Sequence, residues 1–153
     1  MRKVWMLLGL VVVVVPLVAV GCGGDDDEDA ATEAPSKGEF IKQADQICAQ
    51  GDKEIEQAAG DVFGQGQQPS QQEEDRFITK TVIPNVQQQV DDVRALTPPE
   101  GDEQQVAAIL DSAQKGIDAV EEDPSVLTRG GGDPFAESDR LASDYGLKEC
   151  GGG

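Results

Sequence analysis

Apolar residues recur at steps of three and four in four separate segments between residues 36 and 150 of this 153-residue chain. That spacing places each set of apolar side chains on one face of an α-helix. No segment combines alternating apolar and polar residues with hairpin turns, which is the pattern typical of β-sheets. The connections between the segments are short, so neighbouring helices should be antiparallel. The sequence therefore predicts an all-α domain, a small four-helix bundle-like fold.

The first predicted helix covers about residues 37–59 and begins with a capping box. Ser36 stands at the N-cap and Glu39 three residues later, so each side chain can accept a hydrogen bond from the other's backbone N–H. Gly- and Gln-rich residues 60–69 predict a loop, from which Phe63 should fold back onto the core. The predicted inner face consists of Phe40, Ala44, Ile47, Gly51, Ile55, Ala58 and Val62.

The second predicted helix covers about residues 70–96 and contains a proline. Ser70 and Glu73 repeat the capping-box spacing. Because Pro84 has no N–H for the Lys80 carbonyl, a kink or a break is expected near it. The predicted inner face consists of Ile78, Val82, Val86, Gln89 or Val90, Val93 and Leu96.

The third and fourth helices are predicted from about residue 101 to 122 and from residue 133 to 145. In the fourth, Asp133 is the expected N-cap and Pro134 the first helical residue. Gly146 should end that helix in a left-handed conformation, with Leu147 supplying the apolar contact of a Schellman ending. The predicted inner faces are Val106, Ile109, Leu110, Ala113, Ile117 and Val120 in the third helix, and Phe135, Ser138, Leu141, Ala142 and Tyr145 in the fourth.

The N-terminal 22 residues have the pattern of a bacterial lipoprotein signal. Met1-Arg2-Lys3 is followed by a 16-residue apolar run from Trp5 to Val20, and small residues precede Cys22. A basic start, an apolar stretch and a small-residue cleavage site are typical of export. Residues 1–21 are therefore predicted to be a signal peptide, cleaved so that the Cys22 thiol carries a diacylglyceryl group with palmitate-type chains. Two acyl chains suffice for stable anchoring to the outer face of the bacterial cell membrane.

Two alternatives to lipidation stay open. The apolar run could remain as an uncleaved anchor, although it is short for a spanning helix and contains Pro16. The protein could also be secreted without a lipid. Residues 22–35 are predicted to form a disordered acidic tether, because they carry dense charge and no apolar periodicity. The domain then covers residues 36–150, and residues 151–153 form a flexible tail.

Charge argues against a nucleic-acid partner. The formal net charge is −18, and removal of residues 1–21 takes away Arg2, Lys3 and no acid, which gives −20. Binding to phosphate backbones requires Lys and Arg to displace counterions. Self-repulsion of this size also favours a monomer.

Cys48 and Cys150 are the two cysteines that remain after lipidation of Cys22. In an exported protein, such a pair is usually a disulfide. This bond would close a loop of about 100 residues and, in the chain-entropy model, contribute about 4–5 kcal/mol. A reactive thiol at Cys48 is the alternative, but the chain contains no histidine to activate it.

The lack of histidine also removes the commonest general base and metal ligand. Adjacent acidic pairs such as Asp91-Asp92 do not face one another on a helix, so they predict a charged surface rather than a catalytic pair. Residues 25–29 are acidic but lack the spacing of a calcium-binding loop. The sequence therefore predicts no enzyme activity, no cofactor and no metal site.

Two functions remain from the residues alone. One is a docking module that binds a protein of the cell envelope through an exposed apolar patch. The other is a small apolar-ligand binder with a pocket between helices, since the shortage of bulky side chains could leave a cavity. The residues predicted for such a patch or pocket are Phe63, Pro84, Asn85 and Tyr145.

Five short stretches form a set that covers most of the chain after residue 36. They are Phe40-Ile41-x-x-Ala44-Asp45-x-Ile47-Cys48, Thr81-Val82-Ile83-Pro84-Asn85, Leu96-x-Pro98-Pro99, Asp133-Pro134-Phe135-Ala136 and Tyr145-Gly146-Leu147-x-x-Cys150. Together they resemble a group of uncharacterised small lipoproteins or secreted proteins of actinobacterial type. The resemblance implies an envelope location and supports the pairing of the two cysteines. It implies no activity, substrate or binding residue.

Overall fold

The computed structural model describes residues 34–64, 69–130 and 132–152. The predicted signal peptide, Cys22 and most of the predicted tether lie outside the described residues. Within the described part of the chain, helices and turns form the whole structure and no strand occurs. The all-α prediction is confirmed for this part.

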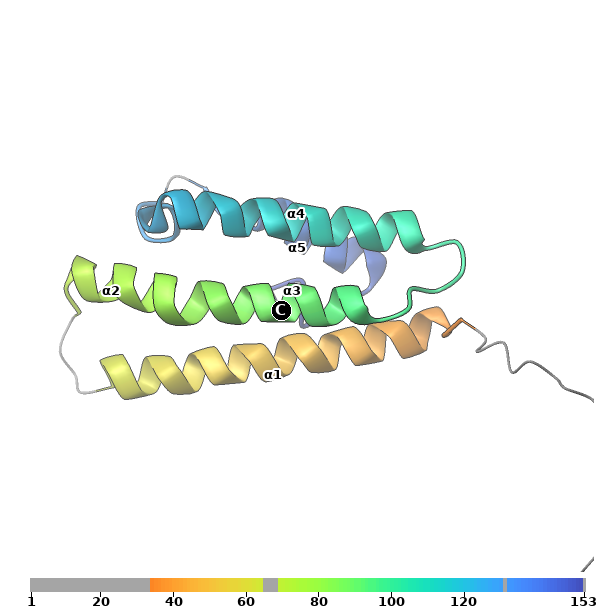
Figure 1. Cartoon of the computed structure of the whole chain (residues 1–153), viewed down its shortest axis with the longest axis horizontal. Helices are drawn as coiled ribbons and strands as arrows, with labels where there is room; N and C mark the ends of the chain where they lie inside the picture. The colour runs from red at the N-terminus through yellow and green to blue at the C-terminus, as the bar shows by residue number, and fades with distance from the viewer. Residues whose placement is uncertain (1–33, 65–68, 131, 153) are drawn as a thin grey trace, which may run out of the picture. The chain divides into compact units, whose positions relative to one another are not determined.

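Three long helical segments lie side by side in one layer, and a shorter helix packs behind them (Figure 1). The layer contains α1 (Lys37–Phe63), the continuous run of α2 (Gln71–Phe77), η1 (Ile78–Val82) and α3 (Ile83–Ala95), and α4 (Glu103–Glu122). The short helix is α5 (Ala136–Tyr145), which packs on α4, and a 3₁₀ turn, η2 (Pro124–Leu127), follows α4. Consecutive segments run antiparallel, as predicted (Figure 1).

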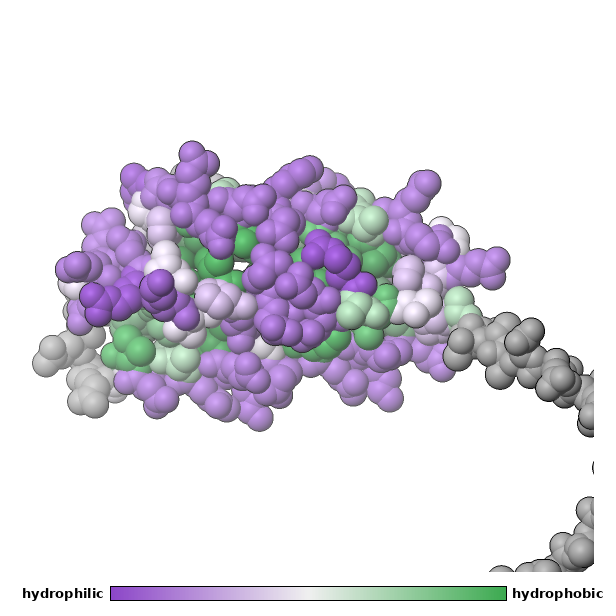
Figure 2. All heavy atoms as spheres, in the orientation of Figure 1, coloured by the Kyte–Doolittle hydropathy of each residue, from purple (hydrophilic) through white to green (hydrophobic). Residues whose placement is uncertain are grey.

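The core lies between this layer and α5. Phe40, Ile117 and Val120 are its largest fully buried side chains. Figure 2 shows that hydrophilic side chains cover most of one face, while hydrophobic residues are visible mainly in the hollows between them. Among the described residues, no aspartate or glutamate is fully buried, so the acidic side chains lie at or near the surface, as the sequence led us to expect.

Both capping boxes form as predicted. The backbone N–H groups of Ser36 and Ser70 each donate to the glutamate three residues later, at 2.9 Å. The reciprocal bonds, from the Glu39 and Glu73 backbone N–H groups to the serine hydroxyls, are also present. The serine hydroxyls also donate to the same carboxylates, at 2.7 Å. The bonds that each carboxylate accepts from the serine hydroxyl and then from the serine backbone N–H lower the pKa of both glutamates, because the ionised carboxylate is the better acceptor.

The first helix is longer than predicted, and one expected core residue is exposed. Helix α1 continues to Phe63, whose ring packs edge-on against Phe77 at 5.0 Å between centroids. This contact with α2 stabilises a last turn that the Gly/Gln-rich sequence did not suggest. Val62 was placed on the inner face, but it is 54% exposed. At this end of α1, half-buried Phe63 rather than Val62 packs against the neighbouring helix.

The second helix is not broken at Pro84. A π turn, η1, precedes the proline, and the Ile83 N–H bonds to the Ile78 carbonyl five residues back. A π turn contains more residues than an α turn, so it changes which residues face the core. Ile83 is therefore buried, whereas Val82, which the simple helical period placed inside, is only half-buried.

The third and fourth helices bury residues from their predicted inner faces, but each begins a few residues later than predicted. Helix α4 begins at Glu103 rather than Gly101. Helix α5 begins at Ala136, because residues 134–135 form a turn in which the Asp133 carboxylate accepts from the Phe135 N–H at 2.9 Å. The end of α5 is as predicted, with Gly146 at φ +109° and the Leu147 N–H bonded to the Ala142 carbonyl.

Gly116 has a packing role that the sequence pattern did not reveal. A Cβ atom at this position would lie 2.9 Å from the Pro134 carbonyl oxygen and collide with the Phe135 ring. Glycine therefore permits the turn before α5 to pack directly on α4. That turn brings Phe135 to the edge of a cavity.

Candidate functional site

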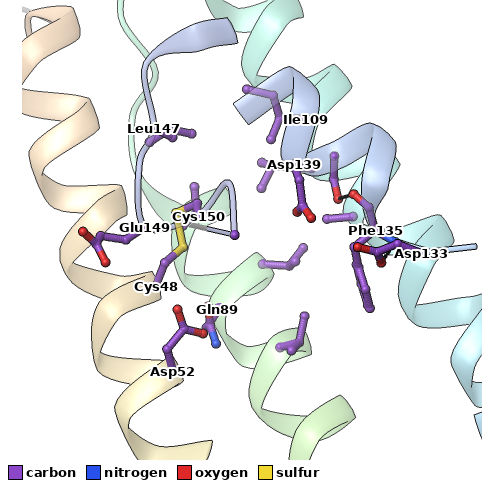
Figure 3. Close-up of a pocket in the computed structure, with 17 residues that line it drawn as sticks. Cys48, Asp52, Gln89, Ile109, Asp133, Phe135, Asp139, Leu147, Glu149 and Cys150 are labelled. Atoms are coloured by element: carbon purple, nitrogen blue, oxygen red, sulfur yellow. Dashed lines mark hydrogen bonds between the residues drawn. A yellow bond between two sulfur atoms is a disulfide. The ribbon is translucent and has the colours of Figure 1, made fainter. Parts of the chain in front are cut away.

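A cavity of about 260 Å³ lies between the three-helix layer and α5 (Figure 3). Every main helix except α2 contributes to it, together with the C-terminal turn after Leu147. Its volume exceeds the roughly 150 Å³ of an apolar cavity that holds one benzene molecule. The space is therefore large enough for a small organic molecule.

The floor of the cavity is apolar. Helices α3 and α4 supply it with side chains that are mostly short: Val86, Val90, Val93, Ile109, Leu110 and Ala113. Phe135 and Leu147 add apolar surface from the two ends of α5. Valine and alanine fill less of the gap between helices than leucine or phenylalanine would. The shortage of bulky residues, noted from the sequence, thus coincides with an open space.

The disulfide forms one wall. Cys48 on α1 and Cys150 in the C-terminal turn are bonded, with Cα atoms 5.2 Å apart, and both line the cavity (Figure 3). The disulfide prediction is confirmed.

Asp45, one turn before Cys48, reinforces the same junction. Its Oδ1 accepts bonds from the Lys148 and Glu149 backbone N–H groups at 3.0 and 3.1 Å. Two neighbouring positions of α1 therefore hold the C-terminal turn over the cavity. The pairing of Asp45 with a segment 103 residues away could not be found from local sequence.

Four carboxylates surround this apolar floor, and sequence reasoning missed them. They belong to Asp52 on α1, Asp133 and Asp139 around α5, and Glu149 in the C-terminal turn. Partial burial raises the pKa of Asp52, and nearby Glu149 raises it further, while the Gln89 amide partly offsets both effects. Burial also raises the pKa of Asp139, with a contribution from Asp133. Each shift reflects the cost of keeping a negative charge beside apolar surface and another acid.

Besides the four carboxylates, the polar side chains of the cavity are Gln89 and Ser138. Ser138 is the one hydroxyl among the lining residues, and it donates to the Phe135 carbonyl at 2.7 Å. Among the described residues, no group of three or more acidic or cysteine side chains is arranged to hold a metal ion. Shape, apolar contact and negative charge are therefore what this site presents to a ligand.

Tyr145 and Asn85 were predicted as polar contacts of a pocket, but neither lines this cavity. Tyr145 is 2% exposed and belongs to the core, where its hydroxyl donates to Asp102 at 2.9 Å. Burial and the bond to Asp102 both raise the pKa of Tyr145, because they disfavour the phenolate. Asn85 lies in a shallow groove between α1 and α3, where its amide donates to Glu54 at 3.2 Å.

Phe63 and Pro84, predicted for an exposed apolar patch, also lie away from the cavity. Phe63 is half-buried against Phe77 at the end of α1. Pro84 is exposed in the first turn of α3. No hydrogen bond or ring contact joins any two of these four predicted residues. The structure does not bring them together as one site.

No helix within the described ranges is both long and apolar enough to cross a membrane. The apolar run from Trp5 to Val20 lies outside those ranges. Comparison of the chain with protein-family models, with curated proteins and with solved structures finds no match.

Proposed function

We propose that this chain is an extracytoplasmic lipoprotein whose helical domain binds a small apolar ligand. The observation that carries the proposal is the apolar cavity of about 260 Å³ between the helices. Pockets of this kind, lined mainly by hydrophobic side chains with a few polar groups, are typical of small-molecule sites. The disulfide and the Asp45 hydrogen bonds hold one wall in place before a ligand arrives. A preformed wall reduces the entropic cost of binding.

Binding is expected to raise the stability of the full-length protein in neutral-lipid nanodiscs. Benzyl alcohol is a suitable probe because it is small, uncharged and mostly apolar. At ten times its dissociation constant, a ligand that binds only the folded state adds about 1.4 kcal/mol to the free energy of unfolding. The thermal midpoint should rise by several degrees, and backbone amide signals of α4 near Ala113 should shift in NMR spectra.

A variant that fills the cavity provides the specific control. Ala113→Phe adds a ring at the floor and should weaken benzyl alcohol binding at least tenfold, whereas Ala108→Phe on the exposed face of the same helix should leave binding unchanged. If the Ala113→Phe variant unfolds, Ala113→Leu can replace it, because leucine fills less of the cavity. Equal binding by the wild type and both fillers, or the lack of any shift near Ala113, would contradict the proposal.

The membrane anchor is the second part of the proposal, and it rests on Cys22 and the residues before it. Intact mass spectrometry of the membrane-extracted protein should show a chain that begins at Cys22 and carries a diacylglyceryl group. The Cys22→Ser variant should lose this mass and leave the membrane fraction. Retention of Met1 without lipid would instead support an uncleaved anchor. The resemblance to small actinobacterial-type lipoproteins also favours an envelope location.

Docking on an envelope protein is the other candidate, and one observation favours it. Val62, 54% exposed, stands beside half-buried Phe63 at the end of α1, so this end presents apolar surface. In-cell cross-linking of the protein tagged after Gly153 would test the idea. One envelope protein recovered in stoichiometric amount from the wild type, and lost with Val62→Gln, would support docking at this end.

A further inference from the structure

Asp139 occupies an unusual position in the cavity. Its carboxylate projects from α5 toward the space between the helices (Figure 3), and the residue is half-buried. Among the described residues, none donates a hydrogen bond to this carboxylate. The ion pairs within the described ranges join Arg94, Arg129 and Arg140 to other acids.

Among the residues that line the cavity, none carries a positive charge that could balance Asp139. The lining contains four acidic residues and neither lysine nor arginine. The opposite side of the cavity is the apolar floor on α3 and α4. A carboxylate that gives up part of its hydration without gaining a partner costs free energy. The raised pKa of Asp139 has the same cause.

A cationic ligand would remove this imbalance. An ammonium group that donates to Asp139 would replace the lost hydration with a charge-assisted hydrogen bond, which is stronger than a neutral one. The apolar part of the same molecule could then rest on the floor around Val90 and Ala113. Asp133 and Asp52, which also line the cavity, would add attraction at longer range. An anionic ligand would meet only negative charges.

This inference rests on the proposed function: we propose that the ligand is an apolar molecule with a protonated amine, which Asp139 binds while the cavity floor holds the apolar part. The ligand class is thus a small hydrophobic amine. Neutral apolar molecules should bind more weakly, and carboxylic acids of the same size more weakly still.

The test compares three probes that share one ring: benzylamine, benzyl alcohol and benzoate. Each is titrated into the full-length protein in neutral-lipid nanodiscs, with empty nanodiscs as the blank, and amide shifts near Ala113 and Asp139 give the dissociation constants. Benzylamine should bind about tenfold more tightly than benzyl alcohol, because a hydrogen bond to a charged group contributes more than a neutral one. Benzoate should bind least.

Variants then assign the preference to one carboxylate. Asp139→Asn should remove most of the preference for benzylamine, of which Asp133 and Asp52 retain a small part, and should leave the affinity for benzyl alcohol unchanged. Glu121→Gln, at an exposed position of α4 outside the cavity, removes the same charge and should change neither affinity. If the Asp139→Asn variant still bound benzylamine as much more tightly than benzyl alcohol as the wild type does, the assignment of the amine to Asp139 would be overturned.

The two proposals fail in different ways. Equal binding of amine and alcohol by the wild type would overturn the amine inference and leave the apolar-ligand function intact. No amide shift near the cavity with any of the three probes would overturn both. Neither result depends on a variant that has to fold.

Discussion

Removal of the disulfide is expected to cost about 4–5 kcal/mol of folding free energy, the largest effect of any change proposed here. Cys48 and Cys150 are 102 residues apart, and the chain-entropy model gives that magnitude for a loop of about 100 residues. Ordinary domains have only about 5–15 kcal/mol of stability. Loss of the bond therefore removes a large share, and the thermal midpoint should fall by roughly 20 °C.

The measurement is thermal and urea unfolding of the Cys48→Ser, Cys150→Ser double variant, compared with the wild type with and without reductant. The reduced wild type should match the double variant, and reductant should not change the variant further. Benzyl alcohol binding should also weaken, because the bond forms one wall of the cavity. Equal melting of the wild type with and without reductant would show that the disulfide contributes little.

Phe40→Ala is expected to destabilise the domain by about 3–5 kcal/mol, the usual range for a phenylalanine removed from a core. The Phe40 side chain is 1% exposed and meets the Tyr145 ring edge-on, with centroids 6.1 Å apart. It thus joins the first turn of α1 to the last turn of α5. The truncated side chain would leave a void between α1 and α5, where the Lys37 ammonium, 3.8 Å from the centroid of the Tyr145 ring, is another contact that joins their ends directly.

Urea denaturation of the full-length protein measures this loss. Phe63→Ala is the matched control, because it removes the same ring from a half-buried position at the opposite end of α1. The control should lose clearly less stability, and Phe40→Leu should fall between the wild type and Phe40→Ala. Similar losses for Phe40→Ala and Phe63→Ala would mean that the α1–α5 contact is not a major part of the core.

The candidate site was less predictable than the fold. From the sequence, a cavity between helices was one of two alternatives, and its polar contacts were expected from Asn85 and Tyr145, neither of which lines the cavity described above. Asn85 instead bonds Glu54, and Tyr145 bonds Asp102 inside the core. Asp52 and Asp139 gave no local signal, because acidic residues on helices usually face water. Their position beside apolar surface follows from how α1 and α5 are placed against α3 and α4.

Features that depend on a few neighbouring residues could be determined from the sequence alone. The capping boxes at Ser36 and Ser70 and the helix end at Gly146 are local hydrogen-bond patterns, so the residue types and their spacing suffice. The helical inner faces follow from the 3.6-residue period. The disulfide also followed, because the predicted export and lipidation of Cys22 would leave one pair of cysteines.

Contacts between distant segments were decided only by the tertiary structure. The π turn exchanged Val82 for Ile83 in the core, which no fixed period predicts. Gly116 admits the turn around Phe135, and this turn places α5 over the floor of the cavity. The size of the cavity depends on how side chains from four helices fill one space. A linear pattern records which face of each helix is apolar, but not how well those faces fit together.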